Sequence, residues 1–122
     1  MPDNYISELM QPPHSIHPSA NVEESVNAMS LQGTDALLIK QAEEYIGIFT
    51  KTDLIKILEN NMNPAEVIVS NIMSKPVLSL DAKLTADEAR QKMQEKNIRH
   101  YAVTQNKKII GLISINDLDS WA

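Results

Sequence analysis

The chain has 122 residues, a net charge of −5 from 11 Lys and Arg against 16 Asp and Glu, and no cysteine. This length allows one compact domain or two small halves that share a core. The missing cysteines exclude disulfides, thiolate zinc sites and cysteine nucleophiles, and the acidic balance argues against nucleic acid and anionic membranes as partners.

No apolar run reaches the roughly 18 residues that a membrane helix needs. The N-terminal segment MPDNYISELM also lacks the basic leader and hydrophobic region of a signal peptide. We therefore expect a cytoplasmic protein without membrane insertion, with a core built mainly from aliphatic side chains.

The first half of the chain predicts a short helical opening, DNYISELM, and then an extended piece, HSIH. Asn21 and Glu24 have the spacing of a capping box, and they start a helix with an apolar stripe of Val22, Val26 and Met29. Two strands, ALLIK and YIGIF, follow around the polar turn QAEE, and TDLIKILENN predicts a second helix.

The second half predicts the same order of elements. The helical opening is NPAEVIVSNIM, in which Asn63 is the expected N-cap and Glu66 closes the box, and VLSL is extended. Thr85 and Glu88 form a second capping box. The stripe of that helix consists of Ala86, Ala89 and Met93. The strands HYAVT and KIIGLI surround the turn QNK, and the final helix is NDLDSWA.

The two halves are copies of one unit, because many residues recur 64 positions later. Both glycines of this register, Gly47 and Gly111, indicate a kink or a close backbone approach. The residues with an identical counterpart in the second half are Pro12, Ser15, Met29, Gln41, Ile46, Gly47, Asp53 and Leu54. The sequence therefore predicts an α/β (α+β) fold of tandem β-α-β-β-α repeats, 1–62 and 63–122, packed as a pseudo-twofold pair.

The repeated stretches GIFTKTDL and GLISINDL allow two interpretations. Thr50 with Asp53, and Ser114 with Asp117, have the spacing of a helix N-cap and an acidic residue at N3, so capping explains each motif alone. The same helix start can also hold a phosphate, and an aspartate one turn on can accept two ribose hydroxyls. Repetition of the motif favours a nucleotide holder.

These motifs resemble the cystathionine-β-synthase-type (CBS) domain pair, also called a Bateman module. The resemblance rests on GIFTKTDL and GLISINDL, on VSNIMSKPVLSL and ISELM, on NIRHYAV and on their spacing, and it covers essentially the whole chain. It implies two clefts between the repeats for adenine nucleotides or their relatives, such as AMP, ADP, ATP or S-adenosylmethionine.

In each implied cleft, the hydroxyl and aspartate of one repeat face the first strand and the strand start of the other. One cleft would combine Thr50, Asp53, Val77, Leu78, Ile98, Arg99 and His100. The other would combine Ser114, Asp117, His14, Ser15 and Ala36. The aspartates would bind the ribose hydroxyls. The hydroxyl side chains and the basic residues would bind phosphate, and the apolar residues would contact the adenine.

The resemblance also implies unequal clefts, because Asp35 and Ala36 stand at the positions of Arg99 and His100. We therefore expect the Asp53 cleft to be the better one. The alternative for Arg99 and His100 is a solvated strand end.

The sequence predicts a non-catalytic regulatory module that signals to an attached or partner protein. The alternative is an assembly module with degenerate pockets, because CBS pairs often form homodimers through their helices. The sequence contains no arrangement of acid–base or nucleophilic residues that would indicate an enzyme, and the predicted module requires no cofactor. His14 and His17 point to opposite faces of an extended piece, so no metal site is expected.

Overall fold

The computed structural model describes residues 4–119, and these form two compact units. The central unit is His14–Val77. The terminal unit combines the residues up to Pro13 with those from Leu78 onward. Both units are built from the predicted β-α-β-β-α order, and the tandem α/β repeat is confirmed.

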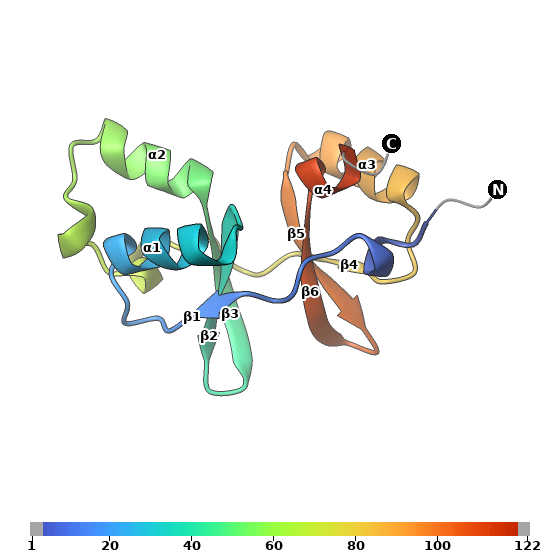
Figure 1. The fold of residues 1–122 in the computed structure, drawn as a ribbon, viewed down its shortest axis with the longest axis horizontal. Coiled ribbons are helices and arrows are strands. Elements are labelled where there is room, and N and C mark those ends of the chain that lie inside the picture. The colour runs from blue at the N-terminus through green and yellow to red at the C-terminus, as the bar shows by residue number, and fades with distance from the viewer. Residues whose placement is uncertain (1–3, 120–122) are drawn as a thin grey trace. The chain divides into compact units, whose positions relative to one another are not determined.

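In the central unit the order of elements is β1 (Ser15–Ile16), α1 (Val22–Gln32), β2 (Ala36–Gln41), β3 (Glu44–Thr50) and α2 (Lys51–Glu59). Two 3-10 turns follow, η2 (Pro64–Glu66) and η3 (Val69–Asn71). The sheet order is β1-β2-β3, with β1 parallel and β3 antiparallel to β2. Both α-helices lie on one face of this sheet (Figure 1).

The terminal unit repeats this plan with η1 (Ile6–Glu8), β4 (Ser79–Asp81), α3 (Ala86–Lys96), β5 (His100–Gln105), β6 (Lys108–Ser114) and α4 (Ile115–Asp119). Its sheet order is β4-β5-β6 with the same parallel and antiparallel pairings. The last residues of the predicted final helix, 120–122, lie outside the described part of the chain.

The capping boxes predicted at the starts of α1 and α3 are confirmed. The Glu24 backbone N–H donates to Asn21 Oδ1 at 2.7 Å, and the Glu88 N–H donates to Thr85 Oγ1 at 3.2 Å. In return the Thr85 N–H and hydroxyl donate to Glu88, which holds the pKa of that carboxyl below its ordinary 4.5. The caps define where α1 and α3 begin.

The opening segments form short 3-10 turns rather than longer helices, and each joins the unit built mainly from the other repeat. The Ile6 N–H donates to the Leu84 carbonyl at 2.8 Å in the terminal unit. In the central unit the Val69 N–H donates to the Ala20 carbonyl at 2.8 Å. The compact units therefore exchange their opening segments relative to the repeats predicted at 1–62 and 63–122.

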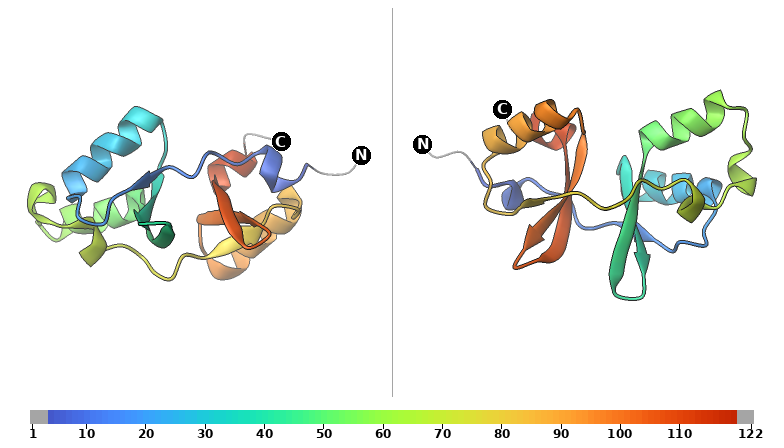
Figure 2. Two further views of the ribbon diagram at one scale, coloured as in Figure 1. Left: turned by 90° about the horizontal axis from the view of Figure 1, so that it is seen from below. Right: turned by 180° about the vertical axis from the view of Figure 1, so that it is seen from behind.

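The segment around η2 lies beside the start of α1, where the Asn21 side chain donates to the Ala65 carbonyl at 3.2 Å (Figure 2). The expected cap at Asn63 forms, but its side chain accepts from the Ala65 N–H, two residues on, rather than from Glu66. The capping box predicted with Glu66 is therefore wrong, because a single 3-10 turn leaves the N2 amide nearest to the cap.

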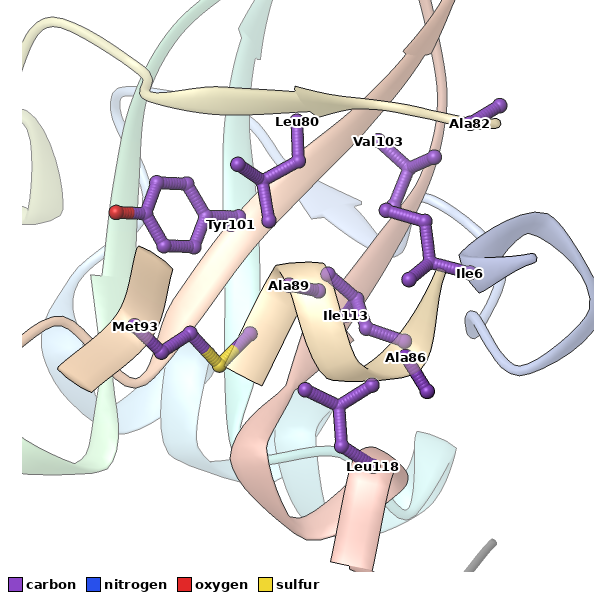
Figure 3. Close-up of a cluster of buried hydrophobic side chains, with 10 residues drawn as sticks. All are labelled: Ile6, Leu80, Ala82, Ala86, Ala89, Met93, Tyr101, Val103, Ile113 and Leu118. Carbon is purple, nitrogen blue, oxygen red and sulfur yellow. The ribbon is translucent and has the colours of Figure 1, made fainter. Parts of the chain in front are cut away.

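Each unit has its own apolar core, to which an opening segment contributes. Figure 3 shows the terminal core, where Ile6 and Ala86 are both 0% exposed. The predicted stripe of α3 is confirmed as buried. In α1 the stripe differs from the prediction, because Ser25 is buried and Val26 only half-buried. Ser25 satisfies its hydroxyl by donating to the Asn21 carbonyl at 3.0 Å.

Candidate functional site

In the central unit the hydroxyl–aspartate motif stands at the junction of β3 and α2. The Thr50 N–H donates to Asp53 Oδ2 at 2.9 Å, and the Thr50 hydroxyl lies 3.3 Å from the same oxygen. Thr50 and Asp53 therefore make the contact that the capping interpretation predicts at the start of α2. Among the residues that the structure describes, none donates a hydrogen bond to Asp53 Oδ1.

In the terminal unit the corresponding carboxylate has more partners. Ser114 donates to Asp117 Oδ2 through its N–H at 2.8 Å and its hydroxyl at 3.0 Å. The Asp117 N–H in turn donates to the Ser114 hydroxyl at 3.2 Å. The Gln11 side-chain amide donates to Asp117 Oδ1 at 3.0 Å, so both carboxylate oxygens are engaged.

The glycines of the motif make room for methionine side chains. A Cβ added at Gly47 would stand 2.5 Å from Met73 Sδ, and one at Gly111 would stand 2.5 Å from Met10 Sδ. The predicted close approach is thus made by the opening segment of the same unit. Sequence reasoning missed the roles of these methionines and of Gln11, although ELMQ and NIMS at matching places were the available signal.

The strand starts lie next to the hydroxyl of their own unit. His100 pairs with Ser114 across β5 and β6, and the Ile115 N–H donates to the Arg99 carbonyl at 3.0 Å. Ala36 pairs with Thr50 in the same way in the central unit. The implied grouping of Arg99 and His100 with Asp53 draws on both units and stays a prediction.

The extended pieces hold the remaining predicted residues. The His14 carbonyl accepts from the Leu38 N–H at 2.8 Å, and the Leu78 carbonyl accepts from the Ala102 N–H at 2.9 Å. The Leu78 side chain is 45% exposed. Arg99 is also exposed, whereas Ile98 packs partly against the terminal core. The remaining members of the set, Ser15 and Val77, are half-buried.

Asp53 borders an open hollow of ≈ 250 Å³ beside α2. Its other lining residues are Lys56, Ile57, Asn60, Met62 and Ile72, all from the central unit. The hollow therefore combines one carboxylate and one ammonium group with apolar walls.

Residues 4–119 contain no group of three or more acidic, His or Cys side chains placed to hold a metal ion. Over the same residues, no helix is both long and apolar enough to cross a membrane. The chemistry that the motif offers is hydrogen bonding by a fixed carboxylate at a helix start.

The family model described as CBS domain matches the chain twice, over residues 6–60 and 69–121. The chain belongs to the CBS-domain family. An uncharacterised protein of Methanopyrus kandleri is 36% identical over 84 residues, which are 67% of this chain and 43% of that protein. A CBS domain-containing protein of Arabidopsis thaliana is 30% identical over 80% of this chain and 18% of its own length. The CBS pair thus spans less than half of these curated relatives.

Solved structures share the fold of this CBS pair. A protein with CBS domains from Burkholderia ambifaria has a TM-score of 0.88 and 25% identity, covering 97% of this chain and 93% of that one. A CBS domain protein of Pyrobaculum aerophilum, complexed with AMP, has a TM-score of 0.80 and 19% identity over 93% of this chain and 89% of that one. A hexameric CBS-CP12 protein of cyanobacteria has a TM-score of 0.85 and 27% identity over 94% and 69%.

Proposed function

We propose that this CBS pair is a non-catalytic regulatory module that binds an adenine nucleotide or a related adenosyl ligand. The observation that carries the proposal is Asp53, which is fixed by Thr50 at the start of α2 and keeps one carboxylate oxygen without a donor among the described residues. A ribose diol offers two hydroxyl donors for such an oxygen pair. The AMP complex of the Pyrobaculum protein adds support for this class of ligand.

Phosphate binding at the start of α2 falls mainly to the positive end of the helix dipole and to basic side chains. The Thr50 hydroxyl has a single proton and donates it towards Asp53, so it has none left for a phosphate oxygen in this arrangement. The first turn of α2 contributes its positive dipole end, although the Lys51 N–H there already donates to the Asp35 carbonyl at 3.1 Å. Lys51 is exposed there, and the exposed Arg99 is the second cation of the proposal.

The other residues of the proposed sites follow the family resemblance. Val77, Leu78 and Ile98 contact the adenine, and His100 joins Arg99 at the phosphate. The residues that the resemblance implies for the second cleft are Ser114, Asp117, His14, Ser15 and Ala36, and the occupancy of this cleft depends on the groups around Asp117. Because the chain spans only part of its curated relatives, the bound state is proposed to act on an attached or partner protein.

Titration calorimetry with AMP, ATP and S-adenosylmethionine tests the proposal. Asp53→Ala should weaken saturable binding at least about tenfold, because a ribose hydroxyl loses a charged acceptor. Glu43→Ala is the matched control, since it removes one exposed carboxylate from the β2–β3 turn of the same unit. Equal affinity of wild type and Asp53→Ala would refute the role of Asp53, and no binding of any of the three ligands would refute the function.

A second candidate function, assembly, is favoured by an apolar stripe on α2 and the residues after it. Ile55 and Leu58 are one helical turn apart on α2 and are 50% and 54% exposed, and Met62, beyond the end of α2, is 43% exposed. We propose that a second copy of the chain covers this stripe to form a homodimer. An antiparallel α2 pair would bring Lys51 of one copy near Glu59 of the other, which gives a self-complementary interface.

Sedimentation equilibrium of the wild type and of Leu58→Glu tests the homodimer. A dimer that becomes a monomer on substitution supports the interface, with Lys92→Glu on the exposed face of α3 as a control for added negative charge. A wild-type monomer at all concentrations would contradict the proposal. A dimer that persists in Leu58→Glu would place the interface elsewhere.

A further inference from the structure

The opening segments of the two units carry different residues at equivalent backbone positions. Gln11 forms an isolated bridge with Leu112, and Ser74 forms the equivalent bridge with Ile48. Both bridges use backbone groups, with N–H to carbonyl distances of 2.8 and 2.9 Å for Gln11 and 2.9 and 3.0 Å for Ser74. Gln11 and Ser74 are therefore structural counterparts, and their side chains can differ without changing the bridge.

The longer side chain at Gln11 reaches the aspartate of its unit. Its amide donates to Asp117 Oδ1 at 3.0 Å, while Ser114 occupies Oδ2 with two donors. A carboxylate has about four lone-pair positions, so three are committed by these bonds alone. A ribose diol needs two acceptor positions, and it would have to displace the Gln11 amide.

The shorter side chain at Ser74 leaves the corresponding aspartate open. Asp53 receives both of its hydrogen bonds from Thr50 on Oδ2. In the described part of the chain, neither Ser74 nor any other residue donates to Oδ1. Asp53 also borders the hollow beside α2, so ligand can approach its side chain.

We propose that Gln11 is a selectivity residue that closes Asp117 to diol ligands, so that the chain binds one nucleotide, at Asp53. This inference rests on the proposed nucleotide function and deepens it. The bond to a charged acceptor that the diol must replace weakens binding at Asp117 roughly tenfold or more. Gln11 acts through Asp117 and needs no contact with the ligand.

Reciprocal exchange of the two counterparts tests the proposal by titration calorimetry with AMP and ATP. Wild type should bind one nucleotide per chain, and Gln11→Ser should bind two. Ser74→Gln should weaken the wild-type site roughly tenfold, because the new amide reaches Asp53 as Gln11 reaches Asp117. In the double variant Gln11→Ser with Asp117→Ala, the added nucleotide should be lost again.

The outcomes separate the inference from the function on which it rests. One nucleotide in both wild type and Gln11→Ser, with Ser74→Gln unchanged, overturns the role of Gln11 and leaves nucleotide binding intact. Two nucleotides in wild type also overturn it. No binding by any variant refutes the proposed function together with the inference. Ser74→Gln decides the question if Gln11→Ser fails to fold, which circular dichroism shows.

Discussion

The central and terminal units differ most where their two helices meet. In the terminal unit Arg90 of α3 donates to the Leu118 carbonyl at 3.1 Å and stands 3.8 Å from Asp119, so it ties α3 to α4. Val26 holds the same position in the central unit. There α1 and α2 leave an open hollow of ≈ 290 Å³, lined by residues that include Val26, Met29 and Leu54.

A duplicated fold therefore tolerates different chemistry at equivalent places. One helix pair is joined by a guanidinium group, and the other leaves a hollow lined by apolar side chains together with Asp35 and Lys51. The exposed stripe of α2 follows the same division, because Ile55 of α2 corresponds to the acidic Asp119 of α4. The central unit thus carries the exposed apolar stripe and Asp53, whose Oδ1 has no donor among the described residues. The terminal unit carries the Arg90 link between α3 and α4, and Asp117, whose two carboxylate oxygens both accept hydrogen bonds.

Substitutions in the opening segments should reduce the free energy of unfolding most. Ile6→Ala should lower the free energy of unfolding by about 3 kcal/mol, because it leaves a cavity in the terminal core. Its counterpart Val69→Ala should cost about 2 kcal/mol in the central core, since fewer buried atoms are removed. Urea unfolding measures the size of each loss.

Hydrogen exchange then locates the loss. Protection should fall in β5 and β6 for Ile6→Ala and in β2 and β3 for Val69→Ala, because each opening segment packs on those strands. Loss of protection in β2 and β3 on Ile6→Ala would contradict the exchange of opening segments.

The glycines of the motif should respond unequally to alanine. At Gly111 the new Cβ would meet the Gln11 carbonyl at 2.7 Å as well as Met10, and a paired backbone carbonyl cannot move cheaply. We expect Gly111→Ala to cost about 2–3 kcal/mol. At Gly47 the closest atoms belong to the flexible Met73 side chain, and Gly47→Ala should cost about 1–2 kcal/mol.

Thermal unfolding of both glycine variants checks this order. The double variant Gly47→Ala with Met73→Ala should regain part of the loss, because the clash is with that side chain. A larger loss at Gly47 than at Gly111 would show that the Gln11 backbone yields more easily than its pairing indicates.

The Arg90 contacts between α3 and α4 should contribute less to the free energy of unfolding than the apolar cores. Arg90→Ala should lower stability by about 1 kcal/mol, since the Arg90 side chain is 28% exposed and its acidic partners are more exposed still. Added salt should weaken the wild type more than the variant. Val26→Ala in the central unit should show no such dependence on salt. An equal effect of salt on the stability of both variants would argue against an electrostatic contribution from Arg90.

The smallest expected effect is a dependence on alkaline pH that only the terminal core carries. Burial, and then the Glu95 carboxylate, raise the pKa of the Tyr101 phenol above its ordinary 10.0. The unfolded chain therefore loses this proton first, so the contribution to stability is complete below about pH 10 and declines as pH rises towards the folded pKa.

Urea unfolding between about pH 9 and about pH 11 measures this decline. Tyr101→Phe should flatten it, because the phenol no longer titrates. Leu37, the counterpart of Tyr101, gives the central core no equivalent group. Identical pH profiles for wild type and Tyr101→Phe would refute the assignment.

Much of the fold follows from local patterns in the sequence. The capping boxes at Asn21 and Thr85 and the alternating strands predicted both β-α-β-β-α orders, and the structure has them. The opening helices were overestimated, because segments of a few residues depend on tertiary contacts and form only 3-10 turns. The hydroxyl and aspartate residues of the repeated motif could be predicted for the same reason as the caps, because their interaction depends only on their spacing at the start of one helix.

The duplication, the helix starts and the place of both hydroxyl–aspartate pairs follow from the amino-acid sequence alone, because capping and strand alternation act between residues close in the chain. Tertiary packing determines which opening segment joins which unit. It also brings Gln11 to Asp117, 106 positions away, while Ser74 leaves Asp53 open. Such contacts depend on how distant segments pack, and no local pattern encodes this packing. The sequence shows that Gln11 is longer than Ser74, but it does not show which group the Gln11 side chain reaches.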